Sequence, residues 1–412
     1  MLQKVYNKNT LFNDPIYGFI PIESDLILKL INHPFFQRLR RISQMGLSSL
    51  VYPGAHHTRF EHAIGAMHIM QKSIGVLKKK GVIISKDENE SMQIAILLHD
   101  IGHGPFSHAS ERILLEDIDH EELSLKIIKL LNIEFNGGLD LAIKIFTNSY
   151  PRKFMHQLVS GQIDVDRLDY LKRDSFYTGV TEGNINTDRI IAMMNVEDEQ
   201  LVFEYKGVHS IEKFLLARRL MYWQVYLHKT SLVAELLLVK ILERFRYLIA
   251  NKQELIDKKH FFYPFIELNS GQPISNAILN NYLLLEDSDL FTLLKSWRNH
   301  KDFVLSNLSK QIIDRKLPKI IIQEKEFSKK KINKISNKLD PYMFNNKDKN
   351  YFVFSGSISN QTYRTDHSQI LIKKKKEQPI PLSKTIKYLD FNQFSKPISR
   401  YYLCYPKNHN SL

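Results

Sequence analysis

Apolar residues recur at helical spacing through the first 310 residues of the chain. The segment 59–80, RFEHAIGAMHIMQKSIGVLKKK, is followed by Gly81, a residue type that often closes a helix. The periodic segment 23–46 is interrupted at Pro34, which predicts a pair of helices rather than one. Further helices are predicted at 88–99, 121–131, 139–146, 155–160, 165–174, 188–194, 211–249 and 290–305. The pattern therefore predicts a mainly α fold.

The pattern changes beyond residue 310. Short runs rich in β-branched and aromatic residues, separated by turn-forming residues, predict strands within LPKIIIQEKEF, YFVFSGSIS, SQILIKKKK and SRYYLCYPK. We therefore predict a helical core over residues 1–310 and a smaller C-terminal α+β lobe over 311–412. The segment 327–350 is rich in Lys and Asn and is predicted to be a mobile connection.

Composition limits the classes of protein that fit. Lys and Arg number 58 against 44 Asp and Glu, and the resulting net charge of +14 suits anionic partners such as nucleotides or nucleic acid. Cys404 is the single cysteine, which excludes a disulfide framework and a cysteine-rich zinc site. The first residues lack the features of a secretion signal, and no apolar run approaches the roughly 18 residues of a membrane span. We expect a cytoplasmic protein with no membrane partner.

Ionisable residues gather directly behind an apolar helix. The stretch 97–111, LLHDIGHGPFSHASE, holds three histidines and two carboxylates. His99 and Asp100 are adjacent, so they can share one ion only near a helix end, and Gly102 supplies that end. Two ligands do not hold a metal, so partners must come from elsewhere. His62 begins a helix, and at least one aspartate of the segment 160–174 is expected to face inward, although spacing does not say which.

Such nitrogen and oxygen ligands suit a divalent transition metal or magnesium and leave positions open for water or phosphate. Six segments in fixed order then resemble the HD-domain phosphohydrolases and, within them, the deoxynucleoside triphosphate (dNTP) triphosphohydrolases. They are DPIYGFI, FFQRLRRISQMG, VYPGAHHTRFEHAIG, LLHDIGHGPFSH, IDVDRLDYLKRD and ARRLMYWQVYLHK. The resemblance implies an HD-domain helical core and a divalent ion, which is Mn, Fe, Mg, Zn or Ni. Its ligands would be His62, His99, Asp100 and Asp166.

The resemblance also implies a reaction. Water activated by the ion would attack the α-phosphorus and release intact triphosphate, leaving the nucleoside 5′-oxygen to be protonated. His108 matches the family's proton donor, and Glu111, one helical turn on, would orient it. His103 matches a phosphate contact and His120 another active-site histidine, while Gly102 and its neighbour Gly104 would let the backbone approach the ligand.

Substrate contacts follow from the same motifs. Phosphate would be bound by Arg59, Arg218 and Lys229. The 3′-hydroxyl would lie near Gln44, Tyr170 and Asp174, while Tyr226 would stack below the sugar and leave no room for a ribose hydroxyl at C2′. Two further aspartates, Asp164 and Asp169, are interpreted as structural.

Partners and alternatives remain open at this level. The resemblance implies a dNTP substrate and a homo-oligomer of two or four copies. A nucleotide activator between subunits is left open, since Gln37 and Arg40 fit that pattern while Thr10 and Asn32 depart from it. Weak nucleic-acid binding is compatible with the charge. The alternative function is an HD phosphohydrolase or phosphodiesterase that acts on another nucleotide or on single-stranded nucleic acid.

Overall fold

The computed structural model describes residues 10–106, 119–251, 253, 255–256, 262–265, 275–342, 347–360, 369–385 and 398–407. The helices are α1 (Asp25–Asn32), α2 (Pro34–Gln37), α3 (Arg59–Lys79), α4 (Lys86–Leu97), α6 (His120–Glu134), α7 (Asp140–Phe146), α8 (Lys153–Val159), α9 (Val165–Thr178), α10 (Thr187–Ala192), α11 (Val208–Met221), α12 (Lys229–Ala250), α13 (Asn276–Tyr282), α14 (Asp287–Trp297), α15 (Phe303–Ile313), α16 (Lys329–Ser336) and α17 (Leu382–Thr385). The predicted mainly α fold is confirmed.

Three small sheets accompany the helices. β1 (Thr10–Asp14) and β2 (Gly18–Ile22) form an antiparallel hairpin. A four-stranded sheet has the order β3-β4-β7-β8, from Met194–Glu197, Gln200–Glu204, Leu371–Lys373 and Ile380–Pro381. A three-stranded sheet has the order β5-β9-β6, from Lys319–Gln323, Ile398–Tyr405 and Phe354–Asn360. Strands therefore lie in each of the four predicted C-terminal runs, whereas the β1–β2 and β3–β4 hairpins were not predicted.

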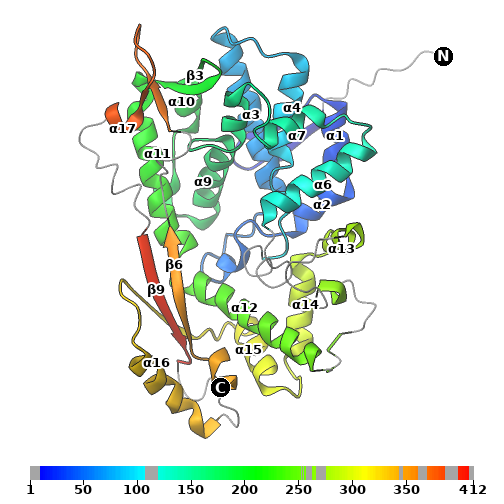
Figure 1. Ribbon diagram of the computed structural model, residues 1–412, viewed down its shortest axis with the longest axis vertical. Helices are drawn as coiled ribbons and strands as arrows, with labels where there is room; N and C mark the ends of the chain where they lie inside the picture. Colours follow the sequence, from blue (N-terminus) through cyan, green and yellow to red (C-terminus); the bar gives the residue numbers. More distant parts are fainter. Residues whose placement is uncertain are drawn as a thin grey trace, which may run out of the picture.

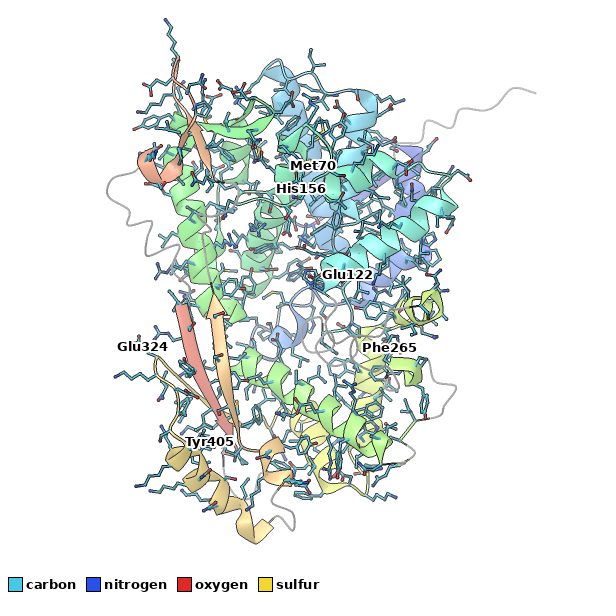
Figure 2. The ribbon with its side chains drawn as sticks, in the orientation of Figure 1. Met70, Glu122, His156, Phe265, Glu324 and Tyr405 are labelled. Carbon is cyan, nitrogen blue, oxygen red and sulfur yellow. The ribbon has the colours of Figure 1, made fainter. Side chains whose placement is uncertain are left out.

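Helix α3 is central to the part of the molecule that carries the site. It packs against α4 and α9 (Figure 1) and is buried along most of its length. Ala63, Ala66 and Met70 are fully buried, and Figure 2 labels Met70 among the surrounding side chains. The helix starts where the Glu61 carboxylate accepts a hydrogen bond from the backbone N–H of Thr58 at 2.5 Å. The N-terminal half of α3 is almost entirely buried and cannot shift without disturbing its neighbours, so it is a rigid support for the residues of the first turns.

Three predictions about single segments were wrong. The helix predicted at 211–249 is two helices, because residues Tyr222–Tyr226 form a π turn and the His228 imidazole then caps α12 by accepting from Thr230 N at 3.2 Å. The helix predicted at 290–305 is divided between α14 and α15, and Asp302 caps the second by accepting from Leu305 N at 2.8 Å. The segment 327–350 is not simply a connection, since it contains α16 and short 3₁₀ turns.

The pair of helices predicted around Pro34 is confirmed as α1 and α2. The division at residue 310 remains a prediction, and β7 from beyond it pairs in parallel with β4 of the helical region. Among the described residues, no helix is both long and apolar enough to cross a membrane.

Candidate metal centre and active site

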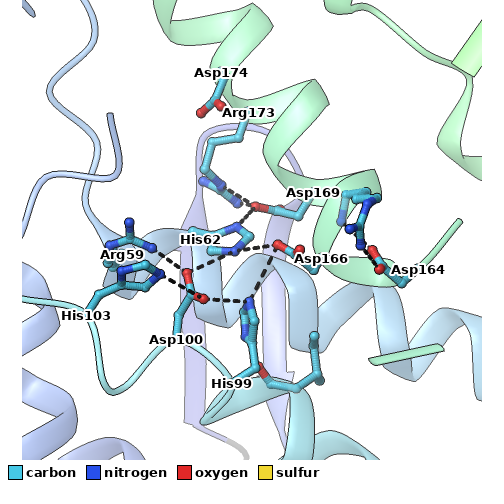
Figure 3. Close-up of polar contacts among 12 residues, drawn as sticks. Arg59, His62, His99, Asp100, His103, Asp164, Asp166, Asp169, Arg173 and Asp174 are labelled. Carbon is cyan, nitrogen blue, oxygen red and sulfur yellow. Dashed lines mark hydrogen bonds and ion pairs between the residues drawn. The ribbon is translucent and has the colours of Figure 1, made fainter. Parts of the chain in front are cut away.

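Three side chains that are distant in sequence meet at one point. His62 lies in the first turns of α3, His99 lies just past the end of α4, and Asp166 lies in the first turn of α9. The Asp166 carboxylate oxygen Oδ1 is 3.1 Å from His62 Nε2 and 3.5 Å from His99 Nε2 (Figure 3). These three residues form a group of ligand atoms close enough together to hold one metal ion.

The two imidazole rings are turned so that both Nε2 atoms face this point. His62 Nδ1–H donates to Asp169 Oδ2 at 2.8 Å, and His99 Nδ1–H donates to the Ile96 carbonyl at 2.6 Å. Each ring is thereby held in the tautomer whose Nε2 carries a lone pair. Within the described part of the chain, neither of these buried Nε2 atoms has a hydrogen-bond partner. Two buried lone pairs beside a carboxylate are the donor set of a metal site.

Asp100 lies at the edge of this group. Its Oδ1 is 3.2 Å from His99 Nε2 and its Oδ2 is 3.8 Å from His62 Nε2. Arg59 donates to Oδ2 at 2.5 Å, and His103 Nε2 is 3.5 Å from Oδ1. Burial alone would raise the Asp100 pKa, but His99, His103 and Arg59 hold it well below its usual range. The carboxylate is therefore ionised and oriented toward the same centre.

The electrostatics of the centre favour a cation. Burial lowers the pKa of His62, but the neighbouring carboxylates of Asp166 and Asp169 outweigh burial and raise that pKa to about 10. Burial likewise opposes ionisation of Asp166, and the two neighbouring imidazoles hold its pKa far below the usual value. Surroundings that stabilise a proton on imidazole also stabilise a metal cation in its place.

The turn that carries His99, Asp100 and His103 is fixed from behind by a buried arginine. Arg38 donates to the carbonyl oxygens of Ile101 at 3.1 Å, His103 at 2.8 Å and Leu285 at 3.0 Å. Because these carbonyls have no access to water, the guanidinium supplies hydrogen bonds that solvent cannot. Arg38 therefore sets the path of the turn.

Gly102 has a different role from the expected one. A Cβ at this position would collide with the backbone of Ser124 and with the His120 carbonyl, so its space is occupied by α6 rather than by a ligand. Gly102 N–H also donates to Ser124 Oγ at 2.9 Å. This close approach stacks the rings of His103 and His120, with centroids 4.0 Å apart and planes at 17°.

A cleft opens beside the metal ligands. It encloses about 580 Å³, part of it open to solvent, and is lined by His99, Asp100, His120, Glu121, Phe146, His156, Val159, Ser160, Asp166 and Arg167. Arg167 and His156 were missed from the sequence. Arg167 directly follows Asp166 and could have been singled out by that position, whereas nothing around His156 in the sequence indicates the cleft.

A second polar cluster lies further along α9. The buried Asp174 carboxylate accepts from His57 Nε2 at 2.7 Å and from the Tyr226 hydroxyl at 2.6 Å. The Tyr170 ring meets the Tyr226 ring edge-on, with centroids 6.1 Å apart. Gln44 Oε1 is buried and has no hydrogen-bond partner among the described residues. His57 was missed, because nothing local distinguishes it from His56.

The other residues predicted for the site lie on α9, α11 and α12 or outside the described part of the chain. Arg218 is half-buried on α11, and Lys229 is exposed at the start of α12. Asp164 caps α9 by accepting from Arg167 N at 2.8 Å, which agrees with a structural role. His108 and Glu111 lie outside the described residues.

Comparison with known proteins agrees with this geometry. Residues 59–174, which include all four predicted metal ligands, match the HD domain family, and residues 185–259 match the HD associated region. A crystal structure of a phosphohydrolase from Bacteroides thetaiotaomicron superposes with a TM-score of 0.92 at 44% identity, over 97% of this chain and 100% of that one.

Curated relatives give the same grouping. The uncharacterized Bacillus subtilis protein YwfO is 34% identical over 320 residues, which are 76% of this chain and 71% of that protein. A Dictyostelium discoideum protein described as a deoxynucleoside triphosphate triphosphohydrolase, SAMHD1 homolog, is 30% identical over 61% of this chain. The matched region spans 52% of the Dictyostelium protein. The chain therefore belongs to the HD-domain phosphohydrolases and to the dNTPase-like family within them that its motifs predicted.

Proposed function

We propose that this phosphohydrolase cleaves dNTPs to deoxynucleoside and intact triphosphate. The observation that carries the proposal is the spacing of Asp166, Tyr170 and Asp174 on α9. Residues four apart share one face of a helix, so the metal centre and the Asp174 cluster face the same side, about 12 Å apart along the axis. That span suits a nucleotide whose phosphate lies at the metal and whose sugar lies at Asp174.

The residues of the centre fit a divalent ion. His62, His99 and Asp166 would hold it, with Asp100 as the fourth ligand implied by the family resemblance. When bound, such an ion supplies a water of lowered pKa and neutralises phosphate charge. The identity of the ion, among Mn, Fe, Mg, Zn and Ni, would be decided by metal analysis of the purified protein.

Phosphate binding would use groups around the cleft. Arg59 is buried and already oriented by Asp100, so its guanidinium could contact a phosphate without losing much side-chain freedom. The stacked pair His103 and His120 supports a second contact, since both rings border the turn after the metal ligands. Arg218 and Lys229 would contact the distal phosphates. Glu111 would orient His108, which would donate the proton to the 5′-oxygen.

Sugar selection would rest on the Asp174 cluster. The unpartnered Oε1 of Gln44 and a remaining lone pair on the Asp174 carboxylate are acceptors for a 3′-hydroxyl. Tyr226 is held by its hydrogen bond to Asp174 and by edge contact with Tyr170. A ring fixed in this way would exclude a 2′-hydroxyl sterically, which favours deoxyribonucleotides.

The direct test is a product assay with all four dNTPs and four NTPs in the presence of Mn²⁺. We expect tripolyphosphate and deoxynucleoside in equal amounts from at least one dNTP, separated by anion exchange. Repeating the assay with GTP or a second dNTP tests whether a nucleotide activates the protein, which the sequence leaves open. Light scattering tests the proposed assembly of two or four copies.

Other products would identify the alternatives. Orthophosphate or pyrophosphate as the sole product would exclude attack at the α-phosphorus. Turnover of single-stranded nucleic acid or of another nucleotide, without turnover of any dNTP, would favour the alternative phosphodiesterase or phosphohydrolase function.

The proton donor can be tested separately. His108→Ala is expected to bind Mn²⁺ as the wild type does and to lose activity by about 100-fold, because an unprotonated alkoxide is a poor leaving group. His209→Ala is a suitable control, since the His209 side chain is 83% exposed and pairs with the nearby Glu212. Wild-type turnover in the His108 variant would contradict the assignment.

A further inference from the structure

A buried polar network lies behind the metal ligand His62. The Asp169 carboxylate accepts from His62 Nδ1–H at 2.8 Å, from Arg173 Nε at 2.8 Å and from the second terminal nitrogen of Arg173 at 3.0 Å. None of these three side chains is exposed to solvent. The His62 ring is therefore oriented by a carboxylate that is itself held by two hydrogen bonds from one guanidinium (Figure 3).

The network continues to the N-terminal hairpin. The remaining terminal nitrogen of Arg173 donates to Asp14 Oδ2 at 2.9 Å. The other oxygen of Asp14 accepts from the backbone N–H groups of Ile16 at 2.8 Å and Tyr17 at 3.0 Å, in the turn between β1 and β2. Three side chains in series, Asp14, Arg173 and Asp169, thus join the turn of the hairpin to a metal ligand.

Helix α3 leaves room for this network at one residue. A Cβ at Gly65 would collide with the Arg173 guanidinium and with the Asp169 carboxylate. Asp169 and Arg173 form an ion pair at 2.8 Å in which neither side chain is exposed. The network is therefore charged, closely packed against α3 and shielded from water, and such pairs are sensitive to the loss of any one member.

We propose that Arg173 and Asp14 are positioning residues for the metal centre, and that the turn of the β1–β2 hairpin thereby sets the affinity of the centre for its metal. This inference rests on the proposed metal site. If Asp14 releases Arg173, the guanidinium can rotate, Asp169 loses its fixed orientation, and the His62 ring no longer points Nε2 at the metal. Groups that orient metal-ligating histidines commonly change metal affinity by about 10-fold to 100-fold when they are altered.

Asp14→Asn separates the two roles of Asp14. The amide oxygen can still accept from Ile16 N–H and Tyr17 N–H, so the turn keeps its hydrogen bonds, but the amide nitrogen then faces the Arg173 donors. Arg173→Lys keeps the charge and loses the planar fork, so a single ammonium cannot contact both Asp169 and Asp14 as the guanidinium does. Mn²⁺ affinity is measured by calorimetry on protein freed of metal by a chelator, and Co²⁺ absorption reports the geometry of the ligands.

We expect the dissociation constant for Mn²⁺ to rise about 10-fold in Asp14→Asn and about 10-fold to 100-fold in Arg173→Lys, with altered Co²⁺ bands in both. Arg244 offers a matched control. Two of its guanidinium nitrogens donate to Asp302 at 3.1 and 2.6 Å, and the third donates to Asp348 at 2.9 Å. Arg244→Lys breaks a network of the same form away from the metal ligands. It should lower the melting temperature and leave Mn²⁺ affinity and the Co²⁺ bands unchanged.

The outcomes are separable. Wild-type Mn²⁺ affinity in both folded variants would overturn this inference and leave the proposed function standing. An equal loss of affinity in Arg244→Lys would overturn it as well, because the effect would then follow general stability. If Arg173→Lys does not fold, the Mn²⁺ affinity of the milder Asp14→Asn variant decides whether the inference holds. A wild-type protein that binds no divalent metal would overturn the proposed function and, with it, this inference.

Discussion

Replacing Asp166 with alanine is expected to abolish Mn²⁺ binding and to lower the proposed dNTP turnover by at least about 1,000-fold, equivalent to about 4 kcal/mol of transition-state free energy. The physical reason lies in the geometry of the centre. Asp166 Oδ1 is within 3.5 Å of the Nε2 atoms of both His62 and His99. By contrast, Asp100 Oδ2 already accepts a hydrogen bond from Arg59, and Asp100 Oδ1 lies 3.5 Å from His103 Nε2. Without Asp166, two neutral imidazoles would have to hold the cation beside a single shared carboxylate.

Metal-dependent stabilisation measures the same loss without any substrate. Mn²⁺ at 100 times its dissociation constant should stabilise the wild type by about 2.7 kcal/mol, seen as a higher melting temperature, and should not stabilise Asp166→Ala. Asp188→Ala is the matched control, because Asp188 is also a first-turn carboxylate but is exposed and pairs with the exposed Lys72. Undiminished Mn²⁺ binding in Asp166→Ala would remove Asp166 from the ligand set.

The convergence of His62, His99 and Asp166 could be predicted because their motifs are local. His62 and Asp166 lie in the first turns of helices that apolar periodicity predicts, and His99 lies at a helix end that Gly102 marks in the sequence. Spacing alone left four aspartates of 160–174 as candidates, and the family resemblance selected Asp166. The structure places Asp166, rather than Asp164 or Asp174, within 4 Å of both histidines.

The supports of the site could not be predicted because they join segments far apart in the chain. Arg173 contacts Asp14 across 159 residues, and Arg38 contacts Leu285 across 247 residues. A buried arginine looks like an ordinary surface charge in the sequence, since only the fold determines which carbonyls and carboxylates surround it. Gly102 was misinterpreted for the same reason, because the atoms that fill its space belong to α6.

The errors in the helices have a related cause. Residues 211–249 keep an apolar periodicity through the π turn at Tyr222–Tyr226, so the pattern gives no sign of the break. The turn contains Tyr226, which donates a hydrogen bond to Asp174 and which the proposed function places below the sugar. A π turn inserts an extra residue and shifts the helix face, which changes the direction in which Tyr226 points.

Replacing Arg38 with methionine is expected to lower the free energy of unfolding by about 3–5 kcal/mol. Methionine fills most of the volume of arginine, so the loss does not come from a cavity. It comes from the three buried carbonyls of Ile101, His103 and Leu285, which would lose the guanidinium and have no water to replace it. Because native proteins are commonly stable by only about 5–15 kcal/mol, this loss is a large fraction of the total.

Urea denaturation followed by circular dichroism measures the effect, and Arg298→Met provides the contrast. Arg298 forms an ion pair with Asp314 at 2.9 Å, but the two side chains are 40% and 30% exposed, so water replaces the lost contact and the expected change is below about 1 kcal/mol. Similar losses in the two variants would mean that the Arg38 hydrogen bonds matter no more than a surface pair. A selective loss at Arg38, accompanied by weaker Mn²⁺ binding, would follow from its position, because the carbonyls of Ile101 and His103 that it binds directly follow His99 and Asp100 in the chain.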